Sequence, residues 1–161
     1  MTFPDDGFWN SRTSLREIKD YAVSRLVSPD AVLAVTLCRI IAATPPHVVL
    51  PPTIGSDYGS LNFGVVILGN PGSGKDAAFG AAKALVPDIR DAPVTSVASG
   101  QAISALFGQR VQEDGRFRLE CKSPRAMLRY SEASNFRALS SARESNLQPE
   151  VLSPVSYTHL R

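Results

Sequence analysis

The sequence has little cysteine and histidine, which restricts the metal sites that it can build. Two of its 161 residues are cysteines and two are histidines. Cys38 and Cys121 show no pairing signature. Before the last few residues, His47 is the only histidine, so three candidate ligands remain. A structural zinc site needs four, so a metal site of the Cys/His kind is excluded. A chain with this cysteine usage is expected to be cytoplasmic.

Excess charge of one sign and long apolar runs are also missing. The 17 basic and 15 acidic residues leave a net charge of +2, so the overall charge gives no argument for nucleic acid. The chain starts with acidic Asp5 and Asp6, which is not the pattern of a signal peptide. The most apolar stretch, 31–43, carries Arg39 and is too short to span a bilayer, so no membrane partner is expected. The composition is that of a soluble globular protein.

Two helices are predicted in the first part of the chain. Ser14 and Glu17 form a capping box, and apolar residues then recur at helical spacing to about Leu26. A second start signal follows at Ser28-Pro29-Asp30, where a capping residue precedes a proline and an acid. The helix that it opens is expected to reach about Ala43.

The most specific motif is glycine-rich and follows the apolar run 63–68: Gly69, Asn70, Pro71, Gly72, Ser73, Gly74, Lys75 and Asp76. It matches the phosphate-binding loop, except that Asp76 stands where serine or threonine is usual. The glycines let backbone N–H groups surround a polyphosphate. Lys75 and the start of the next helix add positive charge. The loop predicts a nucleotide site, with Asp76 as a carboxylate ligand for Mg²⁺.

The segments around the loop predict a doubly wound α/β core. Residues 63–68 suit a buried central strand of a parallel sheet, and the alanine-rich segment 76–85 suits the helix after the loop. Further elements are expected in the following order: a strand at 93–98, a helix at 101–107, a hairpin at 111–121 and a strand at 126–130. Strands that alternate with helices around a phosphate loop are typical of a parallel sheet.

Ser131 and Glu132 follow the last of these strands. Phosphate-loop ATPases commonly carry an acidic pair at this position, of which one residue serves the Mg²⁺ shell and a glutamate orients the attacking water. Glu132 is therefore a candidate catalytic residue together with Lys75, and Ser131 is a candidate metal-site residue. The alternative is that Glu132 caps the helix that follows.

Two features leave a nucleic-acid partner open. Phe8 and Trp9 could stack on a base, although such residues more often cover a helical pair. Segment 110–143 holds eight basic and four acidic residues. This excess could face a nucleic-acid backbone, or it could be the solvated face of the hairpin.

The domain organisation follows from the composition along the chain. A helical segment at 1–43 precedes a proline-rich connector at 44–60. The first part of a nucleotide-binding core is expected at 61–154. Residues 155–161 resemble one reading frame of a sequencing adapter, so we expect the natural sequence to stop near Pro154.

Taken in order, several segments resemble the helicase-type ATPases of phages, plasmids and integrated elements, which are primase-associated proteins with a RecA-like core. The resemblance covers about residues 8–152. It rests on the helical pair and on six matches: Leu50-Pro51-Pro52, Ser60-Leu61-Asn62, the phosphate loop, Ser99-Gly100-Gln101, Ser131-Glu132 and Ser145-Asn146-Leu147. It implies ATP hydrolysis coupled to movement on DNA during replication of a mobile element, commonly as a ring or other oligomer. The partners that it suggests are single-stranded DNA and, for the full-length form, a homo-oligomer.

By position, the resemblance implies that Gly69, Gly74 and Lys75 hold the phosphates of ATP, that Asp76 binds Mg²⁺ and that Glu132 orients the water. It also implies a RecA-like core with further strands, so we expect a C-terminally truncated fragment that binds nucleotide at most. Two alternatives stay open, a nucleotide or small-molecule kinase and a non-catalytic nucleotide-binding module.

Overall fold

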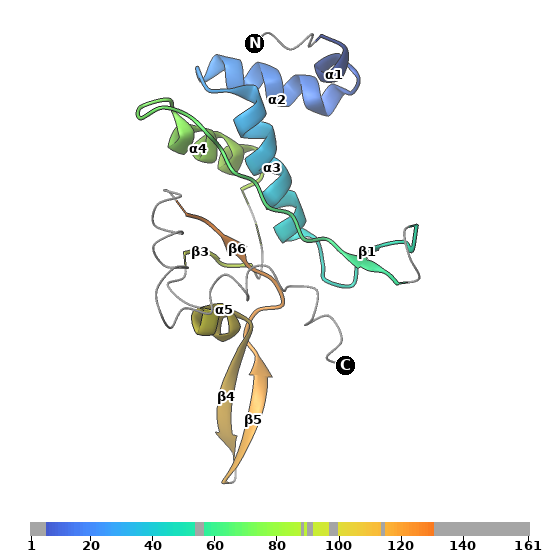
Figure 1. Cartoon of the computed structure of the whole chain (residues 1–161), viewed down its shortest axis with the longest axis vertical. Helices are drawn as coiled ribbons and strands as arrows, with labels where there is room; N and C mark the ends of the chain where they lie inside the picture. Colours follow the sequence, from blue (N-terminus) through green and yellow to red (C-terminus); the bar gives the residue numbers. More distant parts are fainter. Residues whose placement is uncertain are drawn as a thin grey trace. The chain divides into compact units, whose positions relative to one another are not determined.

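The computed structural model describes residues 6–53, 57–87, 89, 92–96, 100–113 and 115–130 (Figure 1). The chain divides into two compact units. The first consists of Met1–Ile41 with Phe63–Asp88, and the second of Ala42–Asn62 with Ile89–Arg161. The elements confirm a mixed α/β class, in which helices come first and small two-stranded sheets follow.

The first unit is helical. Its elements are α1 (Asp6–Asn10), α2 (Thr13–Ser24), the larger part of α3 (Pro29–Ala43) and α4 (Lys75–Leu85). The cap at Ser28 is confirmed, because its Oγ accepts a hydrogen bond from the N–H of Ala31 at 3.4 Å. The capping box at Ser14 is wrong. A cap at Ser14 would start the helix at Leu15, but α2 starts two residues earlier, at Thr13, after Arg12, whose side chain makes no cap hydrogen bond.

The core of the first unit joins α2, α3 and α4. Ala22, Val32 and Ala78 are fully buried in it, and Val27 and Ala81 complete the cluster. The small side chains of α4 permit close approach to the other helices of this core, whereas the alanine-rich segment was expected to pack on a parallel sheet.

Trp9 and Phe8 differ in exposure. Trp9 is 1% exposed, whereas Phe8 is 52% exposed, and their rings meet edge to face at 5.2 Å. Trp9 therefore packs into its unit and offers no ring to a base.

A buried arginine connects α3 with the end of α4. The Arg39 side chain is 4% exposed. Its Nε donates to the Val86 carbonyl at 2.8 Å and its Nη2 to the Pro87 carbonyl at 3.1 Å. A cation at the C-terminal end of a helix also complements the helix dipole. In the sequence, Arg39 served only to exclude a membrane span. In the structure, Arg39 binds the end of α4.

The central strand predicted at 63–68 is wrong. These residues have no regular secondary structure, and the three strand pairs of the described residues do not include them. Val66 is 76% exposed and Leu68 is 88% exposed. A β-strand needs a hydrogen-bonded neighbour, and an apolar sequence alone does not supply one.

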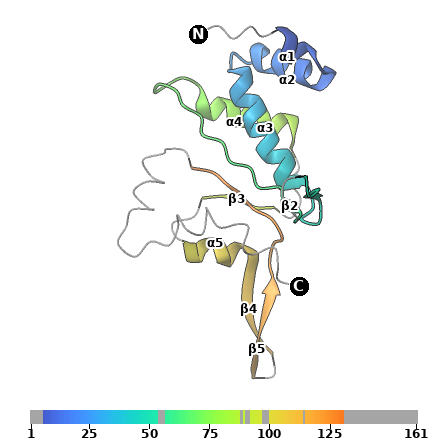
Figure 2. The ribbon, with the colours of Figure 1, turned by 45° about the vertical axis from the view of Figure 1, so that its right-hand side comes forward.

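The described residues of the second unit form three two-stranded sheets. Within the connector, β1 (Val49–Leu50) pairs antiparallel with β2 (Gly59–Ser60). The predicted strands at 93–98 and 126–130 are confirmed in shortened form as β3 (Val94–Thr95) and β6 (Met127–Leu128), which pair in parallel (Figure 2). Helix α5 (Gly100–Phe107) packs on β6 through Ile103. The described residues thus contain two parallel strands, and the larger parallel core expected of a RecA-like ATPase is not seen in them.

The predicted hairpin is confirmed and is longer than expected. Strand β4 (Gly108–Glu113) pairs antiparallel with β5 (Arg116–Cys121) over six residue pairs. Gly115 adopts φ +74° in the turn, as the Asp-Gly signal predicts. The hairpin begins directly after α5, and the Lys122 N–H donates to the Phe107 carbonyl at its base at 2.9 Å. Within the described part of the chain, every helix is too short or too polar to cross a bilayer.

Replacing Arg39 by alanine tests its structural role. The change leaves two carbonyl groups without their buried donor, so we expect a loss of about 1 to 3 kcal/mol in the free energy of unfolding, measured with urea. Arg16→Ala on α2 removes an exposed arginine and is the control, with an expected change within about 0.5 kcal/mol. Equal stabilities of the two variants would contradict the role of Arg39.

Candidate functional site

The glycine-rich segment forms a tight turn followed by a helix start. The Ser73 N–H donates to the Asn70 carbonyl at 3.1 Å. Pro71 occupies the second position of this turn, and Gly72 occupies the third with φ +78°. A proline followed by a glycine of positive φ is the arrangement of a type II turn. The neighbouring residues Pro71 and Gly72 therefore determine the conformation of the first half of the loop.

Gly74 places the start of α4. It is the N-cap residue, with φ +80° and ψ +20°, and it has no side chain to cap the helix. The Ala78 N–H donates to the Gly74 carbonyl at 3.0 Å, which forms the first helical turn. The N-terminus of α4 has no side-chain cap at Gly74. Its first backbone N–H groups and the positive end of its dipole therefore point toward the loop and can interact with an anion there.

Lys75 folds back over the loop. Its Nζ donates to the Gly69 carbonyl at 2.7 Å and to the Asn70 carbonyl at 3.0 Å. The ammonium group thus lies beside Gly69 at the start of the motif, although Lys75 stands six residues later in the sequence. The structure brings together the predicted residues from Gly69 to Lys75.

Gly69 is the position where the loop is tightest. A Cβ atom at this residue would lie 2.5 Å from the Ser73 Oγ and 3.8 Å from the Lys75 Cδ. Non-bonded carbon and oxygen atoms do not approach so closely without a shift. The close atom is the end of the Ser73 side chain, so a larger residue at Gly69 would require the Ser73 hydroxyl to rotate away from the start of the loop.

Asp76 is exposed in the first turn of α4. An acid there is favoured by the positive end of the helix dipole. Groups of three or more acidic, histidine or cysteine side chains that could hold a metal ion do not occur among the described residues. A metal ion at Asp76 would need further ligands from a bound phosphate group and from water.

The second half of the predicted site lies outside the described residues. Ser131 and Glu132 directly follow Tyr130, where the description ends. Strand β6, which was expected to lead to them, is present and parallel to β3. The roles of both residues stay predictions.

Two pKa shifts concern helix α3. Burial lowers the pKa of the Arg39 guanidinium, and burial raises the pKa of the Cys38 thiol. The raised pKa keeps the Cys38 thiol protonated and unreactive near neutral pH. Neither group belongs to the loop.

The exposed apolar residues of the hairpin were not among the predicted site residues. Phe117 and Leu119 on β5 are 74% and 71% exposed. They alternate with the charged residues Arg116, Arg118 and Glu120, and this alternation was used to predict a strand without asking what its apolar side would contact.

No protein-family model matches the sequence, and neither a curated protein nor a solved structure shows a significant match to the chain.

A pair of glycine substitutions tests the geometry of the loop. Gly74→Ala forces a side chain into the left-handed region, so we expect it to lower the free energy of unfolding by about 1 to 2 kcal/mol. Gly80→Ala, in the middle of α4, has nothing within 4 Å of the added Cβ and is expected to raise the same quantity by about 0.5 to 1 kcal/mol. Urea unfolding of both variants measures the difference. A Gly74→Ala protein as stable as the parent would refute the left-handed conformation.

Proposed function

We propose that residues 69–76 bind the phosphates of ATP together with Mg²⁺. The observation that carries this proposal is the combination of two left-handed glycines, Gly72 and Gly74, with Lys75 folded over the start of the loop. A turn of this kind before an uncapped helix N-terminus is suited to anions of high charge.

Lys75 exchanges its partners in this proposal. The carbonyl groups of Gly69 and Asn70 are neutral acceptors, whereas phosphate oxygens are charged. Charge-assisted hydrogen bonds are roughly twice as strong as neutral ones. A bound polyphosphate therefore draws the ammonium group away from the two carbonyls and onto its outer oxygens.

Asp76 fits Mg²⁺ as one ligand among several. Mg²⁺ in nucleotide sites usually keeps several waters and takes one or two carboxylates together with phosphate oxygens. An exposed carboxylate in the first turn of α4 supplies one such ligand. Its own negative charge is offset by the helix dipole and by Lys75.

We further propose that the chain belongs to a helicase-type ATPase that acts in DNA replication of a phage, plasmid or integrated element. This part rests on the order of the motifs. In a RecA-like parallel core, β3 and β6 would be two of the strands, Glu132 would orient the attacking water and Ser131 would serve the Mg²⁺ shell. A homo-oligomer that moves along DNA is part of the same proposal.

Replacing Lys75 tests the nucleotide site. Lys75→Ala removes a charged donor to phosphate, so we expect ATP affinity to fall by about 10- to 150-fold. Titration of the 161-residue chain with a fluorescent ATP analogue and the ATP-dependent rise in Tm measure this loss. Lys83→Ala removes an exposed lysine from the last turn of the same helix and is expected to bind as the parent does. Equal losses in both variants, or no binding by the parent, would refute the site.

The role of Asp76 is tested by comparing two substitutions. Asp76→Ala removes the metal ligand, so we expect it to abolish the gain in ATP affinity that Mg²⁺ produces. Asp76→Ser restores the hydroxyl usual at this position and is expected to keep part of that gain. The same titrations with Mg²⁺ and with a chelator measure both. An unchanged Mg²⁺ dependence in Asp76→Ala would contradict the role.

A further inference from the structure

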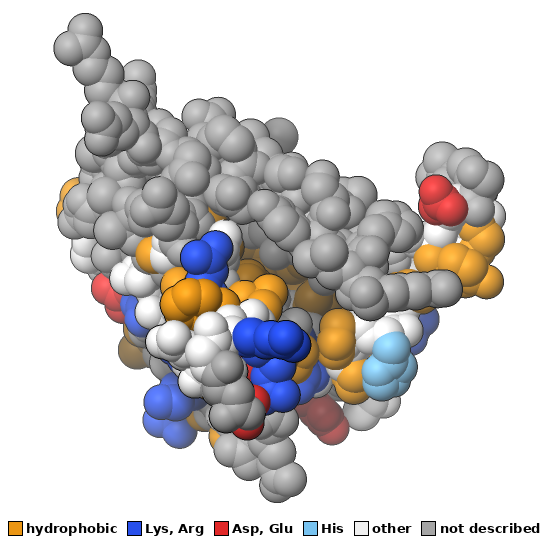
Figure 3. Space-filling model, turned by 90° about the horizontal axis from the view of Figure 1, so that it is seen from below, with side chains coloured by type: hydrophobic (Ala, Val, Ile, Leu, Met, Phe, Trp, Pro, Cys, Tyr) orange, Lys and Arg blue, Asp and Glu red, His pale blue; other side chains and the backbone are white. Residues whose placement is uncertain are grey.

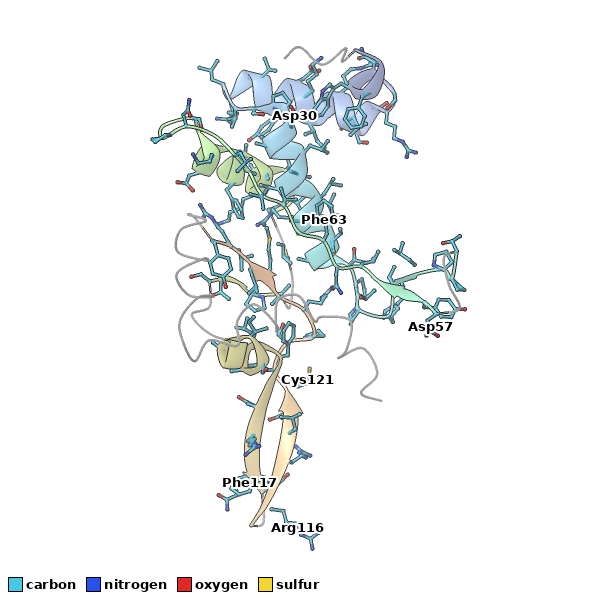
Figure 4. The ribbon with its side chains drawn as sticks, viewed as in Figure 1. Asp30, Asp57, Phe63, Arg116, Phe117 and Cys121 are labelled. Atoms are coloured by element: carbon cyan, nitrogen blue, oxygen red, sulfur yellow. The ribbon has the colours of Figure 1, made fainter. Side chains whose placement is uncertain are left out.

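The β4–β5 hairpin is a two-stranded ribbon with little cover. Every residue of β5 is exposed, and β4 has only Gly108 and Val111 half-buried. Figure 4 shows Phe117 near the free end of the ribbon and Cys121 at its other end. A two-stranded hairpin is marginally stable in water when nothing packs on it, so exposed apolar side chains on this one need an explanation.

The register divides the hairpin into two faces. Residues that lie directly opposite share a face, and successive residues alternate between faces. One face carries Phe117 and Leu119 of β5 opposite Gln112 and Arg110 of β4, with Cys121 opposite Gly108. We call it the Phe117 face. Gly108 leaves room for Leu119, whose Cδ1 lies 3.3 Å from the place of a Cβ at that glycine.

The charges are distributed unequally between the faces. Glu113 and Glu120 are the acidic residues of the two strands, and both lie on the other face of the ribbon, away from the Phe117 face. There Glu113 pairs with Arg118 at 3.8 Å, and Glu120 accepts a hydrogen bond from Gln109 at 3.3 Å. The Phe117 face has Arg110 as its charged strand residue, so it is positive. Figure 3 views the molecule from below and shows basic, acidic and hydrophobic side chains close together.

We propose that the Phe117 face binds single-stranded nucleic acid. Phe117 offers an accessible ring on which a base stacks, and Arg110 offers a guanidinium to a phosphate. Gln112, directly opposite Phe117, places an amide beside the stacked base. Phe117 also lines a hollow with Glu113, Arg116 and Arg118. Two guanidinium groups and one carboxylate therefore surround the ring, and this net positive charge suits a strand with unstacked bases.

A folded protein partner fits this face less well. A stable protein interface buries roughly 800 Å² on each partner, and one aromatic side chain buries about 150 to 250 Å². Phe117 and Leu119 therefore supply too small an apolar area. A single strand needs only stacking and phosphate contacts, each of which is made by individual side chains.

The choice of a nucleic-acid strand as the occupant rests on the proposed helicase-type function. DNA and RNA share the two groups that the face recognises, the base ring and the phosphate. The experiment therefore uses both.

Fluorescence anisotropy tests the proposal. The whole chain is titrated into a labelled oligothymidine and, separately, a labelled oligouridine, at about 50 mM salt, where phosphate contacts contribute most. We expect Phe117→Ala to weaken binding by about 5- to 150-fold, the effect of losing one stacked base. Phe117→Tyr keeps the ring and is expected to bind within about twofold of the parent. The oligonucleotide that binds with the higher affinity identifies the ligand as DNA or RNA.

The matched control for Arg110 lies on the other face. Arg110→Gln is expected to reduce the slope of log affinity against log salt by about 0.7, the value for one phosphate contact on a single strand. Arg118→Gln removes the same charge from the same hairpin and is expected to change the slope less. No binding by the parent, an unchanged affinity in Phe117→Ala, an Arg118→Gln effect as large as that of Arg110→Gln, or tighter binding of a duplex would each overturn the proposal.

ATP binding by the same variants separates this proposal from the proposed function. Phe117→Ala is expected to bind ATP as the parent does. If the parent binds the oligonucleotide through Phe117 but does not bind ATP, the phosphate site is refuted and the hairpin proposal stands. If the parent binds ATP but no oligonucleotide, the hairpin proposal is refuted and the phosphate site is not.

Discussion

The hydrogen bonds from Arg39 to the Val86 and Pro87 carbonyls hold the end of α4, and the position of the phosphate loop depends on this helix. Helix α4 begins at Lys75, inside the motif, and is packed along its length through Ala78 and Ala81. A helix that is buried on one side and held at its C-terminus presents its N-terminus in a defined direction. The loop is thus supported from its C-terminal side by a rigid element.

Features that depend on neighbouring residues could be predicted from the sequence. Pro71 and Gly72 determine the turn between Asn70 and Ser73, because one restricts φ to negative values and the other permits positive ones. The cap at Ser28 followed from the same kind of local argument. The capping box at Ser14 failed because the helix has Arg12 as its N-cap instead, and several residues in a row could have started it.

Features that depend on distant residues were predicted less well. The hairpin succeeded because its partner strands are adjacent in sequence and joined by an Asp-Gly turn. Residues 63–68 failed because a parallel strand needs a partner far along the chain, which an apolar run does not identify. For the same reason the motif residues of the loop could be placed in one site, whereas the relation of Glu132 to that site depends on pairing that no local pattern specifies.

In the proposed nucleotide site, the two sides of the loop therefore contribute differently to the affinity for ATP. On the C-terminal side, α4 is already ordered when the ligand arrives. On the N-terminal side, Val66 and Leu68 are exposed and belong to no strand pair of the described residues. Fixing the backbone of a residue costs roughly 1 to 2 kcal/mol, so holding even a few residues of this segment consumes much of what the phosphate contacts supply. The apparent affinity of such a site equals its intrinsic affinity scaled by the fraction of molecules whose loop is already arranged for binding. A contact that covered Val66 and Leu68 would raise that fraction, and under the proposed function it would strengthen nucleotide binding without touching the nucleotide.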